Sequence, residues 1–382
     1  MTEILLVSGE ASGDIHGANL IKQLKRTAHD LKFTAVGSNK MRSEGAHILF
    51  DIKNLSVMGI LEVVKKIPTI FWLFRRIKHY IRTHKPRLVV LIDAPDFNLR
   101  LAKKIRSEGV KIIYYISPTV WAWRYGRIET IKKYVDKMLV ILPFEEEIYR
   151  RENVPVTYVG HPLLDELKGF LPEAPKELPY HKNSYTIAIL AGSRQYEISF
   201  LINPILEACT LIKEKIPNVN FVISKADTIS EDFLKSKVGN FPVSITTEPV
   251  KKFMGNCDVA IVKSGTSTLE VGLFCVPMVI IYKFSWLTYF IAKYIVRVKK
   301  QQFGLVNILA QQQIVKELFQ RDVTGINIAR EILQFLTDKS HYDATSAKLF
   351  HLRDVLKNKE ASENAANEIR EFIQVRPSPE KH

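Results

Sequence analysis

Two carboxylates follow one of the most apolar runs of the sequence, where a buried strand would end. The run 88–92 is Leu-Val-Val-Leu-Ile, and Asp93-Ala-Pro-Asp96-Phe-Asn98 comes directly after it. A carboxylate at the end of a strand can act as general base for a hydroxyl nucleophile. It can equally close a turn or cap the following helix. Residue chemistry alone leaves both interpretations of Asp93 and Asp96 open.

Basic and hydroxyl side chains follow two further apolar runs in the second half of the chain. Arg194 follows the run 186–190 within Gly-Ser-Arg-Gln, and its planar guanidinium suits phosphate oxygens. Lys263-Ser-Gly-Thr-Ser-Thr-Leu-Glu270 follows the run 257–262 and combines a glycine, hydroxyls and a helix start, which is the composition of an anion site. The alternative for Arg194 is a solvated surface arginine. The alternative for the second motif is a plain capping box formed by Ser267 and Glu270.

A glycine-containing turn follows the first apolar run. Residues 8–14 read Ser-Gly-Glu-Ala-Ser-Gly-Asp, which matches neither the dinucleotide fingerprint nor a phosphate loop. Either a ligand contact or a simple turn capped by Ser12 or Asp14 accounts for it. His16 and His161 have neither metal-site spacing nor a nucleophile partner, so we expect structural roles. No Asp-x-Asp pair is present that could clamp a metal-bound diphosphate.

The stretch 57–82 is unusually apolar, aromatic and basic at once. Its apolar residues exceed one helical stripe, and six Lys and Arg residues are interleaved with them. Such a pattern is typical of an interfacial membrane segment, and equally of two core helices with snorkelling cations. The residues expected to touch a membrane are Ile67, Ile70, Phe71, Trp72 and Phe74.

Alternating strands and helices must position these groups. The apolar runs predict six strands in the first half of the chain (3–8, 33–37, 88–92, 111–116, 138–142 and 156–159) and five in the second (186–190, 219–224, 243–246, 257–262 and 277–282). Helical patterns such as 15–26 and 98–107 separate them, which predicts an α/β protein with doubly wound parallel sheets. In such sheets, ligands bind beyond the carboxyl ends of the strands.

The length of the chain fits two domains, and its cysteine content fits a reducing compartment. The chain has 382 residues, 46% of them hydrophobic, and three widely spaced cysteines. Prolines and glycines around 169–184 predict a linker. The expected division is therefore 1–170, a linker at 171–184, a second domain at 185–343 and a helical segment with a tail at 344–382. No secretory signal is recognisable, and the one long apolar segment, 271–296, is interrupted by Pro277, Lys283 and Lys293. We expect a soluble protein.

The formal net charge of +15 favours polyanionic partners. Nucleic acid, an anionic membrane surface and phosphorylated substrates all satisfy it. No recognised nucleic-acid motif is present.

Taken in order, the motifs resemble those of the lipid-A-disaccharide synthases. The words that carry the resemblance cover residues 5 to about 320 and are found at 8–14, 93–98, 117–124 (Ser-Pro-Thr-Val-Trp-Ala-Trp-Arg), 142–145, 158–163, 192–195, 264–266, 268–270 and 307–309. The motif at 117–124 is the most specific of them.

The resemblance implies a GT-B glycosyltransferase fold, with two Rossmann-like domains facing a cleft. It implies transfer of 2,3-diacylglucosamine from its UDP conjugate to the 6-hydroxyl of 2,3-diacylglucosamine 1-phosphate, with inversion and without a metal or other cofactor. Asp93 is the expected base. The UDP-sugar side is expected to include Arg194, Ser264, Gly265, Thr266, Ser267, Thr268, Glu270 and Asn307, and the acceptor side Ser12, Gly13, Asp14, Asp96 and Asn98.

The same resemblance implies a cytoplasmic protein bound peripherally to the inner face of an anionic membrane, with no nucleic-acid partner. A homodimer is left open. The sequence departs from the family pattern at Ala191, Lys263 and Ser267, where proline, a small residue and alanine are usual. Competing hypotheses are another GT-B enzyme, such as a UDP-N-acetylglucosamine 2-epimerase or a peptidoglycan-precursor glycosyltransferase, and a non-catalytic nucleic-acid-binding protein.

Overall fold

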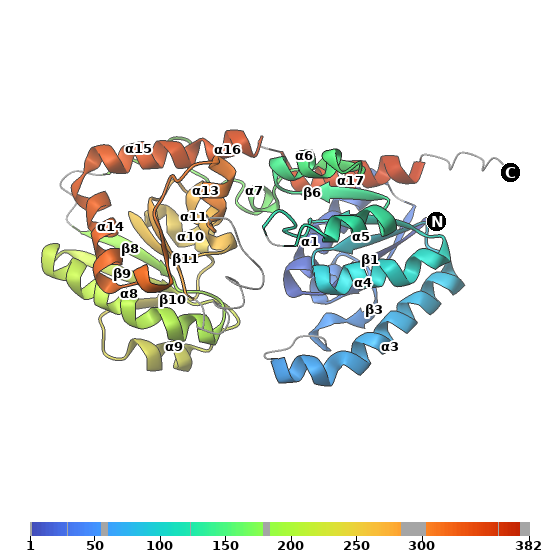
Figure 1. Ribbon diagram of the computed structural model, residues 1–382, viewed down its shortest axis with the longest axis horizontal. Helices are drawn as coiled ribbons and strands as arrows, with labels where there is room; N and C mark the ends of the chain where they lie inside the picture. The colour runs from blue at the N-terminus through green and yellow to red at the C-terminus, as the bar shows by residue number, and fades with distance from the viewer. Residues whose placement is uncertain are drawn as a thin grey trace. The chain divides into compact units, whose positions relative to one another are not determined.

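Two α/β units make up the chain. The computed structural model describes residues 2–28, 30–54, 60–122, 124–178, 184–283, 303–357 and 359–374, with only the backbone for 54 and 60–67. Residues 1–166 and 358–382 form the first unit, and residues 167–357 form the second. Each unit contains one parallel sheet with helices on its faces (Figure 1).

The seven-stranded sheet of the first unit has the order β3-β2-β1-β4-β5-β6-β7. The order reverses between β1 and β4, which is where open parallel sheets bind ligands. Residues of β4 alternate between two cores: Val89 and Leu91 join one, and Leu88, Val90 and Ile92 join the other. This double burial explains the unbroken apolar run. The strands are β1 (Thr2–Ser8), β2 (Leu31–Gly37), β3 (His47–Asp51), β4 (Leu88–Ile92), β5 (Lys111–Tyr115), β6 (Lys137–Val140) and β7 (Val156–Tyr158).

Helices cover both faces of this sheet. One core takes side chains from α3, α4 and α5, and the other takes them from α1 and the C-terminal α17. Helix α17, red in Figure 1, packs against α1. The helices are α1 (Ala11–Thr27), α2 (Asn39–Ser43), α3 (Ile60–His84), α4 (Pro95–Ile105), α5 (Arg127–Tyr134), α6 (Pro143–Arg151), α7 (Pro162–Glu166) and α17 (Ala361–Gln374).

The six-stranded sheet of the second unit has the order β10-β9-β8-β11-β12-β13. It reverses between β8 and β11, and α8, α9 and α14 contribute to its main core. The elements are β8 (Tyr185–Leu190), α8 (Gln195–Lys215), β9 (Val219–Ser224), α9 (Glu231–Val238), β10 (Ser244–Thr246), α10 (Val250–Phe253), β11 (Val259–Lys263), α11 (Thr266–Leu273), β12 (Met278–Tyr282), α13 (Leu305–Ala310), β13 (Glu317–Phe319), α14 (Gly325–Thr337), α15 (Lys339–Phe350) and α16 (Leu352–Val355).

All eleven predicted strands are present within a few residues of their expected ends, and two edge strands, β3 and β13, were not predicted. The three cysteines are buried and none of them is in a disulfide, as expected. Of the predicted linker, 179–183 lies outside the described residues. The range 284–302, which includes the second half of the apolar segment 271–296, lies outside them as well. The predicted C-terminal segment, 344–382, is divided between the two units. Its residues up to 357 belong to the second unit, and α17 belongs to the first.

Candidate active site

Asp93 lies in a strained turn at the carboxyl end of β4. Asp93 and Ala94 both have positive φ angles, 51° and 44°, a conformation that non-glycine residues adopt infrequently. Each such residue costs on the order of 1–3 kcal/mol, and strain of this kind clusters at functional sites. The turn ends β4 and brings the start of α4, at Pro95, directly after it.

Neighbouring side chains hold this turn through its carbonyl groups. Asn98 is fully buried, and its Nδ2 donates to the carbonyls of Ile92 at 3.0 Å and Asp93 at 2.7 Å. The hydroxyl of Tyr114 also donates to the Asp93 carbonyl, at 2.6 Å. The predicted acceptor-side residue Asn98 is therefore placed as a support of the Asp93 turn.

The two candidate carboxylates have different surroundings. Burial, with a further contribution from the negative charge of Glu10, raises the pKa of Asp93 to about 6. The side chain of Asp96 is 67% exposed and accepts from Arg124 at 2.9 Å and Arg127 at 2.5 Å. A partly buried carboxylate with a raised pKa is the better base, and a carboxylate engaged by two guanidinium groups is the poorer one. The surroundings of the two carboxylates favour Asp93 over Asp96 as the candidate base.

The turn after β1 packs beside the Asp93 turn. A Cβ added to Gly9 would lie 2.6 Å from the Cβ of Ala94, so this approach requires glycine. Ser12, Gly13 and Asp14 lie in the first turn of α1, with Ser12 exposed and Gly13 buried. The carboxylate of Asp14 accepts the backbone N–H groups of Ser38, Lys40 and Met41, and so supports the start of α2.

Of the two predicted structural histidines, His161 is buried and His16 is partly buried. Burial lowers the pKa of His16 to about 4 and that of His161 to about 3, so both are neutral at physiological pH. Nδ1 of His161 accepts the backbone N–H of Leu163 at 3.2 Å, a local structural contact.

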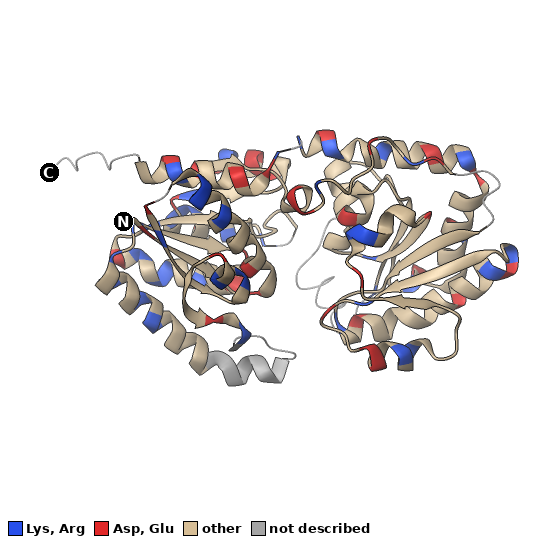
Figure 2. Ribbon diagram, turned by 180° about the vertical axis from the view of Figure 1, so that it is seen from behind, with Lys and Arg blue, Asp and Glu red and all other residues tan. Residues whose placement is uncertain are grey.

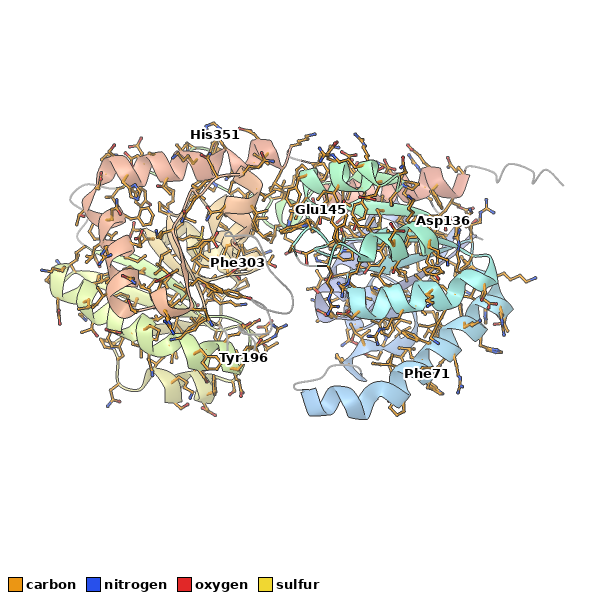
Figure 3. All side chains as sticks on the ribbon, viewed as in Figure 1. Phe71, Asp136, Glu145, Tyr196, Phe303 and His351 are labelled. Atoms are coloured by element: carbon orange, nitrogen blue, oxygen red, sulfur yellow. The ribbon has the colours of Figure 1, made fainter. Side chains whose placement is uncertain are left out.

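A buried carboxylate that lies in the motif 142–145, but was given no role from the sequence, supports the segment after β5. Glu145, labelled in Figure 3, lies near the start of α6 and is 1% exposed. It accepts from the Trp121 indole N–H at 3.2 Å and from the backbone N–H of Leu142 at 3.2 Å. Burial raises the pKa of Glu145 to about 8. The proline followed two residues later by glutamate, typical of a helix start, was the available signal.

A cavity of about 490 Å³ lies at the carboxyl ends of the strands in the second unit. It is lined by the segments that follow β8, β9, β10 and β11, and thus includes the point where the strand order reverses. The size falls within the range of small-molecule sites. Of the predicted donor-side residues, those that line this cavity are Arg194, Ser264, Gly265, Thr266 and Ser267.

The other predicted donor-side residues do not line it. Thr268 is fully buried, donates to the Gly265 carbonyl at 2.8 Å and accepts the backbone N–H of Leu305 at 3.1 Å. Asn307 is also fully buried and bonds to the backbone of 314–315 and to Glu317. Glu270 lies on α11 and is partly buried. Thr268 therefore supports the start of α11, whose first residues line the cavity, and Asn307 holds the backbone at 314–315.

Four further charged residues of the cavity lining were missed as site candidates: Glu197, Lys225, Asp227 and Glu248. Glu197 is three residues after Arg194, in the first turn of α8, and is 6% exposed. A carboxylate in the first turn of a long helix next to a predicted phosphate loop was the available signal. Asp227 follows β9, and the rule that ligands bind beyond the carboxyl ends of parallel strands would have selected it.

Helix α3 carries the predicted membrane residues, and only part of them face outward. Phe71 and Trp72 are 50% and 49% exposed, and Ile70 is partly buried. Phe74 is 4% exposed and packs against Phe97 with ring centroids 5.0 Å apart, so it belongs to the core. The side chain of Ile67 lies outside the described residues. No helix in the described part of the chain is both long and apolar enough to span a bilayer.

Exposed cations surround the two outward-facing aromatic rings. Arg75 and Lys104 lie over the ring of Phe71 at 5.8 and 4.5 Å from its centroid, and Arg76 lies 5.2 Å from that of Trp72. Figure 3 labels Phe71 on α3, and Figure 2 shows the Lys and Arg residues of this helix in blue. The one helix thus combines a core face with an aromatic and basic face.

The fold matches solved sugar-nucleotide enzymes along the whole chain. A UDP-N-acetylglucosamine 2-epimerase from Neisseria meningitidis, bound to UDP-GlcNAc, aligns with a TM-score of 0.65 at 12% identity, covering 98% of this chain and 100% of that one. The calicheamicin glycosyltransferase CalG4 aligns with a TM-score of 0.63 at 14% identity, covering 99% and 100%. The two parallel-sheet units therefore have the GT-B architecture of glycosyltransferases and related epimerases, which confirms the predicted fold class.

Sequence comparison defines the family within that class. The family model described as lipid-A-disaccharide synthetase matches residues 4–372. The lipid-A-disaccharide synthase of Geobacter sulfurreducens is 38% identical over 374 residues, covering 97% of each chain. That of Coxiella burnetii is 37% identical over 372 residues, covering 97% of this chain and 98% of its own. The chain belongs to the lipid-A-disaccharide synthase family, glycosyltransferases of lipid A biosynthesis.

Proposed function

We propose that the chain transfers 2,3-diacylglucosamine from its UDP conjugate to the 6-hydroxyl of 2,3-diacylglucosamine 1-phosphate. The products are the β-1,6-linked disaccharide 1-phosphate and UDP. The observation that carries this proposal is the cavity at the strand reversal of the second unit, with Arg194 and the start of α11 on its lining. Open parallel sheets bind nucleotides at this position.

Asp93 is the general base in this proposal. Its pKa of about 6 leaves the carboxylate ionised at neutral pH, yet more basic than an ordinary aspartate. A base with a pKa near the working pH combines the right protonation state with a strong drive to accept a proton. As the acceptor 6-hydroxyl oxygen bonds to the anomeric carbon, Asp93 takes the hydroxyl proton. The bond from that carbon to the UDP oxygen breaks in the same step, which inverts the centre.

The second unit stabilises the departing UDP without a metal. Arg194 supplies a guanidinium that can pair with two phosphate oxygens. Ser264, Gly265 and Thr266 lie at the start of α11, where the backbone N–H groups of the first helical turn and the helix dipole favour an anion. Such donors act where charge develops in the transition state.

We also propose that α3 binds the inner face of an anionic membrane, where both acylated substrates reside. Phe71 and Trp72 offer half-exposed rings, and Arg75, Arg76 and Lys104 offer cations beside them. An interfacial helix needs this combination, because rings insert at the headgroup level while cations pair with anionic lipids.

Incubation with defined substrates tests the proposal. With both acylated glucosamine substrates in detergent micelles and excess EDTA, we expect one UDP released for each disaccharide formed, detected by chromatography and mass spectrometry. Incubated with UDP-N-acetylglucosamine alone, the protein should leave the sugar unchanged in proton NMR spectra. Appearance of the manno epimer, or failure to join the two lipids, would overturn the proposal.

A further inference from the structure

One buried carboxylate contacts both basic residues that line the cavity from the ends of β8 and β11. Oε1 of Glu197 lies 2.9 Å from Nζ of Lys263 and 3.5 Å from Nη1 of Arg194. Its Oε2 accepts the backbone N–H of Ser193 at 3.2 Å. Because β8 and β11 are the strands at which the sheet order reverses, Glu197 ties together the two loops on either side of the reversal.

The turn that precedes Arg194 is shaped around this carboxylate. Gly192 has φ of 121°, and a Cβ at this position would lie 2.7 Å from Oε2 of Glu197. A side chain there would displace the carboxylate and adopt a strained backbone, so the approach requires glycine. From the other side, the hydroxyl of Thr228 donates to the Ser193 carbonyl at 2.6 Å. The turn is therefore held at both the N–H and the carbonyl of Ser193.

Lys263 is held at the lining of the same cavity. It is the last residue of β11, its side chain is 20% exposed, and its ammonium lies 5.6 Å from the ring centroid of Tyr282. Glu197 and the ring fix the direction of the ammonium, while the residue still lines the cavity beside Ser264. A lysine fixed in this way presents a charge with little conformational freedom left to lose on binding.

Within this cluster the cations outnumber the carboxylate. Arg194 and Lys263 contribute two positive charges and Glu197 one negative charge, so the three together carry one net positive charge. Elsewhere on the lining, Lys225 adds one positive charge, and Asp227 and Glu248 add two negative charges. A carboxylate as buried as Glu197 is costly without a partner, and the ion pair with Lys263 satisfies it. The pair thus keeps two cations close together, and the cluster carries one net positive charge toward a diphosphate.

We propose that Lys263 is a second phosphate-binding cation of the sugar-nucleotide site, and that Glu197 is the positioning residue that holds Lys263 and the Gly192–Arg194 turn toward the diphosphate. The proposal rests on the proposed function, because it assumes that the cavity binds UDP. It adds Glu197 to the site, gives Lys263 of the predicted anion motif a specific role, and assigns the ion pair a function in nucleotide binding.

Binding of UDP and of uridine, measured by titration calorimetry, separates phosphate contacts from all others. Lys263→Met keeps a stem that can pack on Tyr282 and removes the charge. We expect it to weaken UDP binding about 10-fold or more, the size of a charged hydrogen bond, and to change uridine binding less than 2-fold. Equal UDP affinity in Lys263→Met and the unaltered protein would overturn the assignment of Lys263.

Glu197→Gln tests positioning against simple neutralisation. If Glu197 only cancels positive charge, its removal strengthens UDP binding. If it positions the cations, UDP binding weakens, and the double variant with Lys263→Met is weakened by less than the two single effects combined. Stronger UDP binding by Glu197→Gln would therefore overturn the positioning role. If this variant fails to fold, as shown by thermal unfolding, Glu197→Asp replaces it: a shortened carboxylate that mispositions Lys263 also weakens UDP binding, and unchanged binding counts against positioning.

A matched control comes from an ion pair of the same kind outside the cavity. Lys235 and Glu231 on α9 are 2.7 Å apart and largely exposed, so Lys235→Ala should leave both affinities unchanged. The outcomes distinguish the two proposals. If the unaltered protein binds no UDP, the proposed function fails. If it binds UDP and Arg194→Ala weakens binding but Lys263→Met does not, only the inference about the ion pair is wrong.

Discussion

Replacing Asp93 by asparagine should abolish turnover and stabilise the protein at the same time. The amide keeps the shape of the side chain but cannot accept the proton of the acceptor hydroxyl. Loss of a general base lowers rates by about 10²–10⁴-fold. Asp93 belongs to the first unit and the nucleotide cavity to the second, so UDP affinity should stay within about 2-fold.

The stability gain follows from the raised pKa. The pKa of Asp93 rises from 3.8 to about 6, and each unit corresponds to about 1.4 kcal/mol, which gives about 3 kcal/mol in all. The folded state binds the proton more tightly than the unfolded state, so the native protein loses stability as pH rises from about 4 to 6. Asparagine carries no charge and avoids this loss. Asp93→Asn should therefore exceed the original protein by up to about 3 kcal/mol at pH 8 and by much less near pH 4.

Urea unfolding at both pH values, followed through the transition of the first unit, measures this difference. The acid limb of the kcat/KM profile should fall near the pKa of Asp93, about 6. Arg194→Ala should lower kcat/KM at every pH but leave the acid limb at the same pH, because Asp93 is still present. An unchanged limb in this variant shows that the limb does not come from Arg194. Retained turnover in Asp93→Asn, or a stability gain that is equal at pH 4 and pH 8, would refute the reasoning.

Three further predictions concern other parts of the molecule. Arg194→Ala should weaken UDP binding about 10-fold or more and flatten its salt dependence, measured by calorimetry at several salt concentrations; an unchanged Kd would remove Arg194 from the phosphate site. Asn98→Ala removes one donor from each of two carbonyls of the Asp93 turn, of which the Asp93 carbonyl keeps Tyr114, and should lower stability by about 1–3 kcal/mol and kcat more than UDP affinity; normal kcat would limit Asn98 to a structural role. Replacing Phe71 and Trp72 together by serine should reduce sedimentation with anionic vesicles at unchanged stability, whereas the buried Phe74→Ser should cost about 3–5 kcal/mol instead; full vesicle binding by the double variant would count against α3 as the membrane contact.

The sequence predicted the strands well because most of them are buried on both faces. Runs such as 88–92 are apolar throughout, and only a central parallel strand requires this. The strands β3 and β13 lie at the edges of their sheets, are short and include partly buried residues, so they lack that signal. Packing of α17 against α1 joins residues far apart in the chain, and periodicity carries no information about such a contact.

The site was predictable where it depends on strand ends and less so where it depends on the direction of a side chain. Asp93, Arg194 and Ser264 follow strands and were found by that rule. Thr268 and Asn307 have suitable side chains, but these bond to the surrounding backbone, which sequence spacing does not reveal. The resemblance proposed from short motifs was confirmed by whole-chain similarity to the family.

The configuration of the new glycosidic bond tests the central claim most directly. If the acceptor oxygen attacks the anomeric carbon while Asp93 takes its proton, one displacement inverts that carbon. The disaccharide made by the purified protein should then show the anomeric proton coupling of a β-1,6 linkage in NMR spectra. An α-linked product would require retention of configuration, and would contradict a single displacement assisted by Asp93.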